Sequence, residues 1–350
     1  MPGALRFCRV DRVSGLAGTY ARIAELPFVI EGYGLERLEA PVTRDLMRVT
    51  TLVRLTGGGE EGLGEDVTWY AEEHDREQAA GASRPLVGSW TLESFSGALA
   101  IEEPHKRWAY ESAALDVALR QAGRSLGDSL GRTPRPVTFV VSPGLGDPPS
   151  AEPLRRRLEL HPELRFKLDA ASAWTDELVY ELAATGTVDI VDYKAYYADP
   201  NSAPPDLALY RRVAEGFPDV WLEDPALTDE TDEVLRPHRD RITWDAPIHS
   251  VADVENLAFV PRTLNAKPSR FGFVRELLDF YDYCADRGIG LYGGGMFELG
   301  AGRGQIQHLA SLFYPDAPND VAPGGYNERE PRPGLPPTPL PAPRNEPGFR

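Results

Sequence analysis

The sequence predicts an α/β protein built on a parallel (β/α) barrel, and three observations support this. From residue 137 onward, short apolar runs of strand type alternate with segments of helical pattern. Three of these runs stop at a charged residue that turn formers follow, at Glu223, Asp245 and Lys267. The charged positions lie 22 residues apart, from 223 to 245 and from 245 to 267, about one strand plus one helix. Since a parallel barrel carries its chemistry at the carboxyl ends of its strands, we expect these side chains to share one rim.

Length and composition limit the class of protein. A chain of 350 residues with 42% hydrophobic and 26% charged residues can bury one large core and a smaller one, which favours two domains. A net charge of −17 argues against nucleic acid as a partner. No apolar run approaches the roughly 18 residues of a membrane span, no signal peptide opens the chain, and the two cysteines are far apart. We therefore expect a cytoplasmic protein with no membrane partner.

The lysines are informative because they are rare. Only four of the 37 basic residues are lysines, and Lys167, Lys194 and Lys267 all stand where predicted strands end. Lysine is a compact cation whose pKa falls readily on burial, so it can act as a base where arginine cannot. A chain that otherwise uses arginine is expected to need lysine chemistry at these positions.

The N-terminal part of the chain has weaker signals. Residues 1–30 show no clear pattern, and residues 16–20 are compatible with a flexible loop. Residues 48–55 alternate as a strand, reach Gly57-Gly58-Gly59 and continue to Gly62-Leu63-Gly64-Glu65, which predicts a strand pair with a glycine-rich turn. Residues 71–104 are polar with helical patches, and small apolar residues on one face predict a helix over 112–126.

The remaining chain predicts the barrel in order. The predicted strands are 137–141, 165–169, 188–194, 220–223, 242–245, 263–267 and 289–292. The predicted helices are 153–160, 175–184, 206–215, 228–236, 251–258 and 272–286. An eighth strand, short or irregular, is expected after residue 310. The tail from Glu328 is rich in proline and is expected to run in extended form over the surface.

Carboxylates at neighbouring strand ends predict a metal site. Glu223 and Asp245 should converge on one point, where they would repel each other unless a hard divalent cation lay between them. Oxygen ligands suit Mg²⁺. Lys267, on the next strand, would then face the ion from the side. A metal that holds a substrate carboxylate, with a lysine beside it, is a site for removing the proton α to that carboxylate.

These motifs resemble the enolase superfamily over about residues 45–320. The resemblance rests on Gly62-Leu63-Gly64-Glu65, Ala114-Leu115-Asp116-Val117-Ala118, Leu222-Glu223-Asp224-Pro225, the Asp245 strand end, Asn265-Ala266-Lys267-Pro268-Ser269-Arg270 and Met296-Phe297-Glu298. The lysine is similar to that of the muconate-lactonising and o-succinylbenzoate synthase branch. The resemblance implies an α+β N-terminal capping domain, a (β/α)7β TIM-type barrel and a Mg²⁺-stabilised enolate.

On this resemblance we expect a capping domain over residues 1–110, completed by the C-terminal tail. The catalytic barrel would take 111–327 and the proline-rich tail 328–350. Loops of the capping domain would select the substrate, a small molecule that contains a carboxylate. A homo-oligomer is possible, since barrels of this family often self-associate.

Two alignments with the branch compete for the first metal ligand. In the first, strand two ends Lys167-Leu168-Asp169 where the branch has Lys-x-Lys, and Asp192 ends strand three, so Asp192, Glu223 and Asp245 hold the metal. In the second, Asp169-Ala170-Ala171-Ser172-Ala173-Trp174 stands for Asp-Ala-Asn-x-x-Trp, and Asp169 is the ligand. The first alignment is favoured because it gives the number of strands that the barrel is expected to have. Asp169 then replaces the second lysine of the motif, and Lys194 replaces the usual asparagine.

The sequence thus predicts a Mg²⁺-dependent enzyme that abstracts a proton α to a carboxylate, with isomerisation or elimination as outcome. Lys267 would be the base or the stabilising cation, with Lys167 and Asp169 opposite. Two alternatives are a Schiff-base lyase that uses Lys267 as nucleophile and a barrel that binds carboxylates without catalysis. The glycine-rich loop around Glu298 either offers backbone N–H groups to a substrate anion or makes a tight turn.

Overall fold

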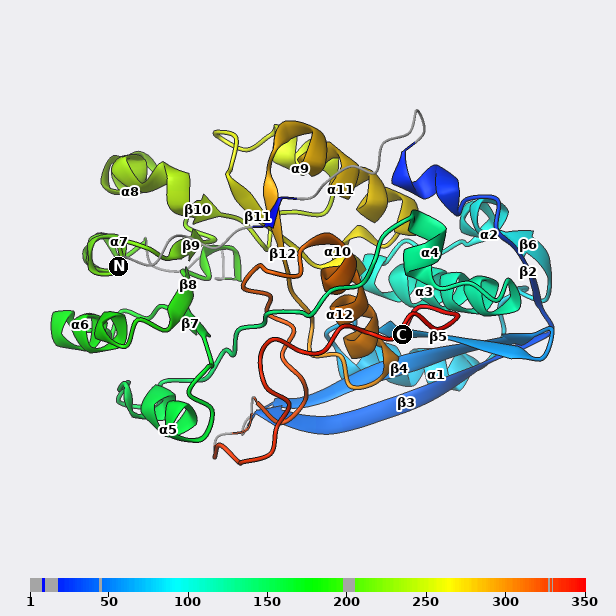
Figure 1. Ribbon diagram of the computed structural model, residues 1–350, viewed down its shortest axis with the longest axis horizontal. Helices are drawn as coiled ribbons and strands as arrows, with labels where there is room; N and C mark the ends of the chain where they lie inside the picture. The colour runs from blue at the N-terminus through cyan, green and yellow to red at the C-terminus, as the bar shows by residue number, and fades with distance from the viewer. Residues whose placement is uncertain (1–7, 10–17, 44–45, 198–204, 327, 329) are drawn as a thin grey trace.

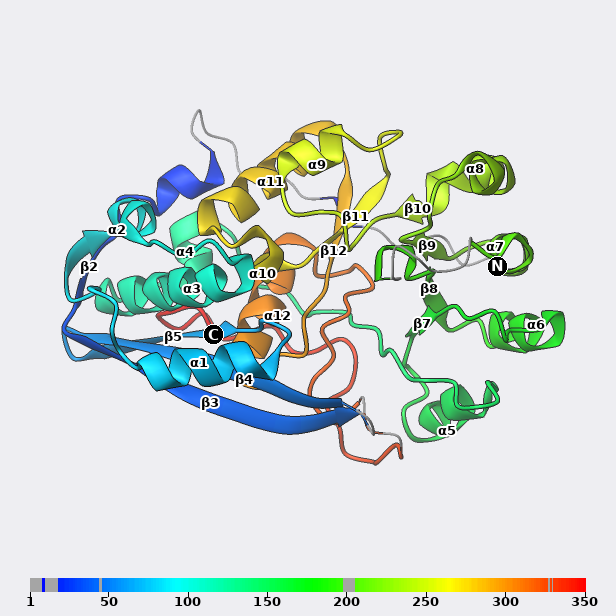
Figure 2. The same ribbon diagram turned by 180° about the vertical axis from the view of Figure 1, so that it is seen from behind.

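The computed structural model describes residues 8–9, 18–43, 46–197, 205–326, 328 and 330–350. It has two parts, a smaller one built on long antiparallel strands and a larger one in which helices surround a ring of short parallel strands (Figure 1, Figure 2). No helix in these ranges is long and apolar enough to cross a lipid bilayer.

The smaller part is an antiparallel meander with helices against it. β3 (Gly32–Thr43), β4 (Leu46–Gly57) and β5 (Glu60–Asp66) pair in that order, and β2 (Pro27–Ile30) pairs with β6 (Gly88–Thr91). The predicted strand pair over 48–65 is confirmed, and its turn uses Gly58 and Gly59, whose φ angles are +58° and +79°. The sequence did not predict β3, because this edge strand has no fully buried residue among those described and so lacks apolar alternation.

The long helix α3 (Pro104–Gln121) packs on this sheet, next to the short helices α1 (Ala71–Ala80), α2 (Leu92–Ala98) and α4 (Leu126–Leu130). The predicted range 112–126 was wrong at both ends. The helix begins at Pro104, where the Glu103 side chain accepts a hydrogen bond from the Lys106 N–H, and Gly123 with φ +62° follows its end. Gly64 lets helix and strand approach closely, since a Cβ there would lie 1.9 Å from the Ala109 carbonyl oxygen.

The larger part is a closed parallel barrel. Its regular strands are β7 (Phe166–Asp169), β8 (Val188–Asp192), β9 (Trp221–Glu223), β10 (Ile242–Thr243), β11 (Thr263–Ala266) and β12 (Gly290–Gly293), with β1 (Cys8–Arg9) antiparallel to β12. β7 to β10 pair in sequence order, and β11 pairs with β12. The Asn265 N–H donates to the Trp244 carbonyl oxygen at 3.0 Å, which joins the two groups of strands.

The ring closes through two segments that are less regular than strands. Residues 137–141 form only bridges: the Lys167 N–H donates to the Val141 carbonyl at 3.1 Å, and the Val140 N–H donates to the Asn319 carbonyl at 2.8 Å. Asp320 pairs with Gly294 on the other side. The described chain therefore forms eight parallel segments, of which the eighth, near residues 319–320, is short, as the sequence predicted.

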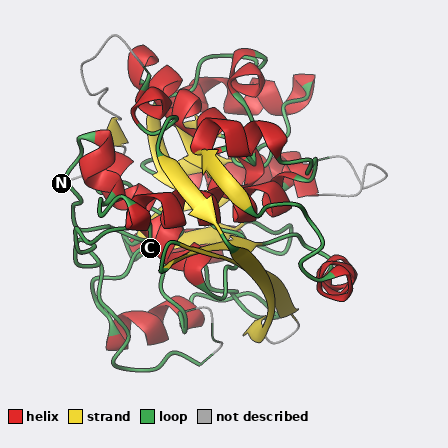
Figure 3. Ribbon diagram, turned by 90° about the vertical axis from the view of Figure 1, so that its right-hand side faces the viewer, coloured by secondary structure: helices red, strands yellow, loops and turns green. Residues whose placement is uncertain are grey.

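Helices cover the outside of this ring (Figure 3). They are α5 (Glu152–Leu160), α6 (Asp176–Ala184), α7 (Leu207–Gly216), α8 (Asp229–Leu235), α9 (Val251–Glu255), α10 (Pro268–Phe271), α11 (Val274–Arg287) and α12 (Ala301–Phe313). Short 3₁₀ turns lie at Thr19–Arg22, Ala195–Tyr197 and Arg236–Arg241. The predicted helices over 153–286 are confirmed within a few residues.

The C-terminal tail is fastened to both parts. Leu340 exchanges backbone hydrogen bonds with Val137, and the fully buried Phe349 ring lies between Trp108 of α3 and His308 of α12. The tail thus links the long helix of the smaller part to the last helix of the barrel.

Candidate active site

The carboxyl ends of four neighbouring strands place the predicted acids in one row. In the strand register Asp169 pairs with Asp192, Asp192 with Glu223, and Glu223 with Thr243, two residues before Asp245. β8, which Asp192 ends, is the third parallel segment of the ring. Asp192, Glu223 and Asp245 are buried, whereas the Asp169 carboxylate is exposed. The parallel pairing therefore brings these acids together at one rim.

Lys167 is held by these acids from β7. Its ammonium lies 2.7 Å from Glu223 and 3.3 Å from Asp192, with Asp320 at 3.9 Å. Burial alone would lower the pKa of Lys167, but the carboxylates of Glu223, Asp192 and Asp320 outweigh burial and raise it well above its usual value. Lys167 therefore stays a cation in this arrangement.

Lys267 has different surroundings on the far side of the ring. Its ammonium lies 2.7 Å from Asp245, whose other oxygen accepts a hydrogen bond from Arg270 at 2.6 Å. Burial lowers the pKa of Lys267, Asp245 opposes this, and the Arg270 cation adds to the lowering. Because β7 and β11 are the second and sixth of the eight parallel segments, Lys167 and Lys267 face each other across the barrel.

Lys194 connects the first two acids of the row. Its ammonium lies 2.6 Å from Asp192 and 3.2 Å from Asp169, and its backbone N–H donates to the Asp192 carboxylate at 2.8 Å. Its φ of +54° is uncommon for a residue with a side chain. This conformation turns the chain just after β8 so that side chain and backbone both reach the acids.

Two further residues of the site were not predicted. Asp224 accepts hydrogen bonds from the N–H groups of Asp245 at 2.7 Å and Ala246 at 2.9 Å, so its carboxylate holds the end of β10 in place. Asn265 donates to Glu223 at 3.3 Å. The signal for Asp224 was visible in Leu222-Glu223-Asp224-Pro225, but only the pairing of β9 with β10 shows what the second carboxylate binds.

The donor set fits a divalent cation. One oxygen each of Glu223, Asp224 and Asp245 lies within 4.8 Å of the others. Lysine ammonium groups lie 2.7 Å from Glu223 Oε2 and 2.6 Å from Asp192 Oδ2, so these two buried oxygens are held by cations. Burial and the neighbouring acids, opposed by Lys167, raise the pKa of Glu223 to about 8. Such crowded carboxylate oxygens are the ligands that Mg²⁺ prefers.

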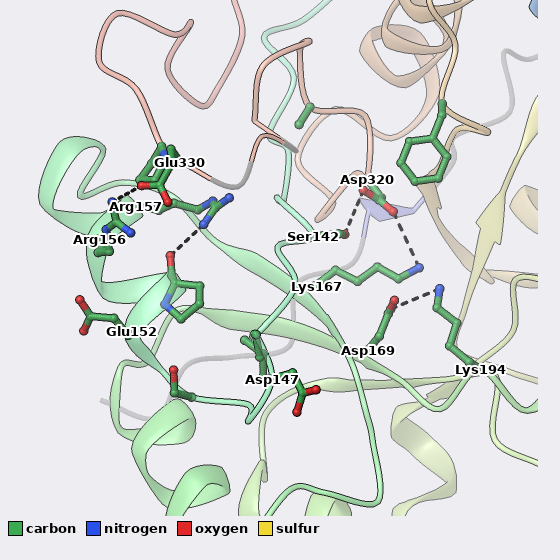
Figure 4. Close-up of a pocket in the computed structure, with 18 of the residues that line it drawn as sticks. Ser142, Asp147, Glu152, Arg156, Arg157, Lys167, Asp169, Lys194, Asp320 and Glu330 are labelled. Atoms are coloured by element: carbon green, nitrogen blue, oxygen red, sulfur yellow. Dashed lines mark hydrogen bonds and ion pairs between the residues drawn. The ribbon is translucent and has the colours of Figure 1, made fainter. Parts of the chain in front are cut away.

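A pocket of about 830 Å³ opens above this row. It is lined by all three lysines together with Asp169, Phe297 and Arg303, among others. Figure 4 shows the Lys167 and Lys194 side chains reaching the same region, with Asp320 and Asp169 beside them. The opposite side of the pocket is formed by α5 and the tail, where Arg156 contacts Glu330. The pocket therefore gives a small molecule access to the predicted lysines.

The glycine-rich loop before α12 has a partner in the smaller part of the molecule. The buried Glu65 of β5 accepts hydrogen bonds from the N–H groups of Leu299 at 2.6 Å and of Gly300 and Gly302 at 2.9 Å. A Cβ on Gly302 would lie 2.9 Å from the Glu65 carboxylate. These three N–H groups therefore bind a side chain of the protein and are not available to a substrate anion.

Comparison with known proteins agrees with this architecture. Residues 21–129 and 133–328 match the N-terminal and C-terminal domains of a family described as a domain of unknown function, DUF8230. The chain is 30% identical over 323 residues to the N-succinylamino acid racemase of Thermus thermophilus, covering 86% of this chain and 84% of that protein. It is 26% identical over 304 residues to the o-succinylbenzoate synthase of Geobacillus stearothermophilus, covering 78% and 76%.

Solved structures share the fold. Muconate cycloisomerase from Pseudomonas fluorescens superposes with a TM-score of 0.64 at 21% identity, over 84% of this chain and 87% of that one. A dipeptide epimerase from Methylococcus capsulatus, complexed with a Mg ion, gives a TM-score of 0.63 at 21% identity, over 83% and 89%. With the acids and lysines at the barrel rim, these likenesses show that the chain belongs to the enolase superfamily, in its branch of muconate-lactonising enzymes, o-succinylbenzoate synthases and N-succinylamino acid racemases.

Proposed function

We propose that this protein is a Mg²⁺-dependent enzyme that removes the proton α to a substrate carboxylate, and that its substrate is an N-acylamino acid which it racemises. The observation that carries the proposal is the row of acids at the ends of β8, β9 and β10 between lysines that face each other across one pocket. The similarity to an N-succinylamino acid racemase over 86% of the chain supports the substrate class.

Asp192, Glu223 and Asp245 would hold the ion. When bound, the ion would supply positive charge that makes the α-proton of a coordinated carboxylate more acidic. Asp224 is not included among the proposed ligands because backbone N–H groups bind both of its oxygens, whereas the oxygens of Asp245 are bound by the side chains of Lys267 and Arg270. Lys267, oriented by Asp245 at 2.7 Å, would take the proton at its Nζ on one face of the substrate.

The other face of the substrate would meet Lys167, Asp169 and Lys194. Lys167 is held as a cation by Glu223 and Asp192 and would stabilise negative charge on the substrate. Asp169 is exposed to the pocket with Lys194 at 3.2 Å, so this pair would exchange the proton on the second face. The second face therefore carries the Asp169–Lys194 ion pair where a racemase would use a second lysine base. This difference supports a second candidate reaction, the elimination of water with Lys267 as the base on one face.

Metal affinity tests the ligand set. Titration calorimetry with Mg²⁺ should show binding by the wild type and by Asp169→Ala, and its loss in Asp192→Ala and Glu223→Ala. Loss of binding in Asp169→Ala with retention in Asp192→Ala would instead make Asp169 the ligand. Absence of Mg²⁺ binding by the wild type would refute the proposed chemistry.

Proton exchange tests the reaction. With N-succinyl-L-amino acids in D₂O and Mg²⁺, we expect deuterium at the α-carbon, and formation of the D-isomer distinguishes racemisation from exchange on one face. Lys267→Met should lower the exchange rate at least about 100-fold. Lys106→Met should not change it, because Lys106 does not line the pocket and pairs with Glu77 instead. Borohydride trapping of a carbonyl compound on Lys267 would support the Schiff-base lyase. Binding of these acids without any exchange would support a barrel that only binds carboxylates.

A further inference from the structure

Phe297 carries the only aromatic ring among the described residues that line the 830 Å³ pocket. Its backbone has a φ of +59°, which is a genuine outlier for a bulky side chain. Conformations of this kind cost free energy and persist only where the surrounding structure fixes them, commonly at ligand sites. The strained backbone at Phe297 therefore indicates that this residue has a role at the pocket besides the folding of the loop.

Contacts on both sides fix this conformation. The Met296 N–H donates to the Glu298 carboxylate at 2.7 Å, and the Met296 carbonyl accepts a hydrogen bond from the buried Arg48 at 3.2 Å. The centroid of the Phe297 ring lies 6.5 Å from that of the half-exposed Trp69 ring, with the two rings tilted by 55°, and the Arg48 guanidinium lies over the Trp69 ring at 5.2 Å from its centroid. Arg48 and Trp69 belong to the smaller part of the molecule, so both parts hold the Phe297 ring at the pocket.

The same loop runs beside the lysine proposed as base. A Cβ on Gly294 would lie 2.8 Å from Cε of Lys267, so the backbone packs directly on that side chain. A Cβ on Gly295 would lie 2.4 Å from the Glu298 carboxylate, which fixes the path of the chain toward Phe297. The segment from Gly294 to Phe297 therefore connects Lys267 to the Phe297 ring along one wall of the pocket. A substrate whose α-carbon lies at Lys267 would meet the Phe297 ring on this wall.

We propose that Phe297, positioned by Trp69 and Arg48, is the specificity-determining contact for a large apolar or aromatic side chain on the α-carbon of the substrate. This proposal rests on the proposed function for the place of the α-carbon, and it narrows the substrate class to N-acyl derivatives of large apolar amino acids. The pocket is also lined by Lys167, Lys194 and Arg303, each of which is paired with a carboxylate of the protein, and their N–H groups are suited to the polar groups of such a molecule.

The test compares two probes that differ only in their side chain, N-succinyl-L-phenylalanine and N-succinyl-L-alanine. Calorimetry in the presence of Mg²⁺ should give the wild type on the order of tenfold tighter binding of the phenylalanine derivative, as expected for one good aromatic contact. Phe297→Gly should bring the ratio of the two affinities, for the phenylalanine and the alanine derivative, to within about twofold of unity. Trp69→Ala should reduce this ratio in part. Tyr180→Ala, which removes an exposed ring on α6, serves as control and should keep the wild-type ratio.

Phe297→Gly also separates selectivity from folding. Glycine adopts positive φ without strain, so this variant should unfold at no lower temperature than the wild type. A lower unfolding temperature with an unchanged affinity ratio would show that the ring is structural and would overturn the proposal, as would equal affinity of the wild type for both probes. Selective binding without deuterium exchange would refute the proposed function and leave this inference standing. Failure to bind either probe would refute both.

Discussion

At the scale of single residues, backbone strain marks the candidate site. Within the described ranges, the residues other than glycine with positive φ are Lys194, Asp224 and Phe297. Each lies just beyond a barrel strand and contacts the acids or the pocket. Such conformations cost on the order of 1–3 kcal/mol each. Their concentration at one rim indicates that the geometry of this rim is maintained at the expense of local stability.

A buried histidine gives a prediction at this scale. His308 of α12 is 2% exposed, neither ring nitrogen has a hydrogen-bond partner among the described residues, and burial lowers its pKa to about 4. The unfolded chain, with a pKa near 6.5, gains a proton that the folded protein excludes, so stability should fall as the pH drops from about 6.5 toward 4. Up to about 3 kcal/mol of this loss belongs to His308.

Urea unfolding of His308→Phe and wild type across this pH range measures the effect. The variant should lose less stability on acidification than the wild type. His249→Gln, at a half-exposed site, is the control and should follow the wild type. Parallel pH curves for wild type and His308→Phe would contradict the prediction.

At the scale of elements, the beginning of α12 depends on a strand of the other part of the molecule. The first N–H groups of a helix lack partners within the helix, and here Glu65 of β5 accepts hydrogen bonds from Leu299, Gly300 and Gly302. Burial raises the pKa of Glu65, and Glu298 adds to the rise while these N–H groups oppose it. One buried carboxylate thus orders the loop that carries Phe297 and Glu298.

Removal of this carboxylate should therefore destabilise the protein. Glu65→Ala leaves buried N–H groups without an acceptor and should lower the free energy of unfolding by about 3 kcal/mol. Glu60→Ala, at the exposed start of the same strand, should change it by less than about 0.5 kcal/mol. Equal unfolding curves for the two variants would show that Glu65 does not stabilise α12.

At the scale of the whole molecule, the tail fastens the two parts together. The Phe349 ring contacts Trp108 at 6.4 Å and His308 at 6.0 Å between centroids, and its N–H donates to Asp116 of α3 at 2.8 Å. The C-terminus lies beside α3, α12 and β5 in both opposite views (Figure 1, Figure 2). The last residues of the chain are therefore part of the core between the barrel and the smaller part.

Truncation of this ring tests the role of the tail. Phe349→Ala should lower the free energy of unfolding by about 3 kcal/mol, as for other fully buried phenylalanines. Arg344→Ala, whose side chain is 87% exposed in the same tail, should have little effect. Unchanged stability of Phe349→Ala in denaturant titrations would show that the tail is dispensable for the fold.

The sequence by itself determined the parallel barrel and the place of its chemistry. Strand and helix periods are local signals, and a charged residue at a strand end must lie at the rim once the strands run parallel. The alternation after residue 137 and the ends at Glu223, Asp245 and Lys267 could therefore be predicted. β3 and the limits of α3 could not, because an edge strand without a buried face and a helix start set by Pro104 give weak periodic signals.

Only the tertiary structure decided what the charged groups contact. Glu65 is 234 residues from Leu299, Asn265 is 42 residues from Glu223, and Asp224 is 21 residues from Asp245, so no local pattern connects them. The same holds for the contact between Lys194 and Asp169, which arises from the register of β7 and β8, whereas Asp192 is only two residues from Lys194. Sequence fixes which groups lie at the rim through short-range periodicity, whereas their partners depend on long-range packing that closes the ring and joins the two parts.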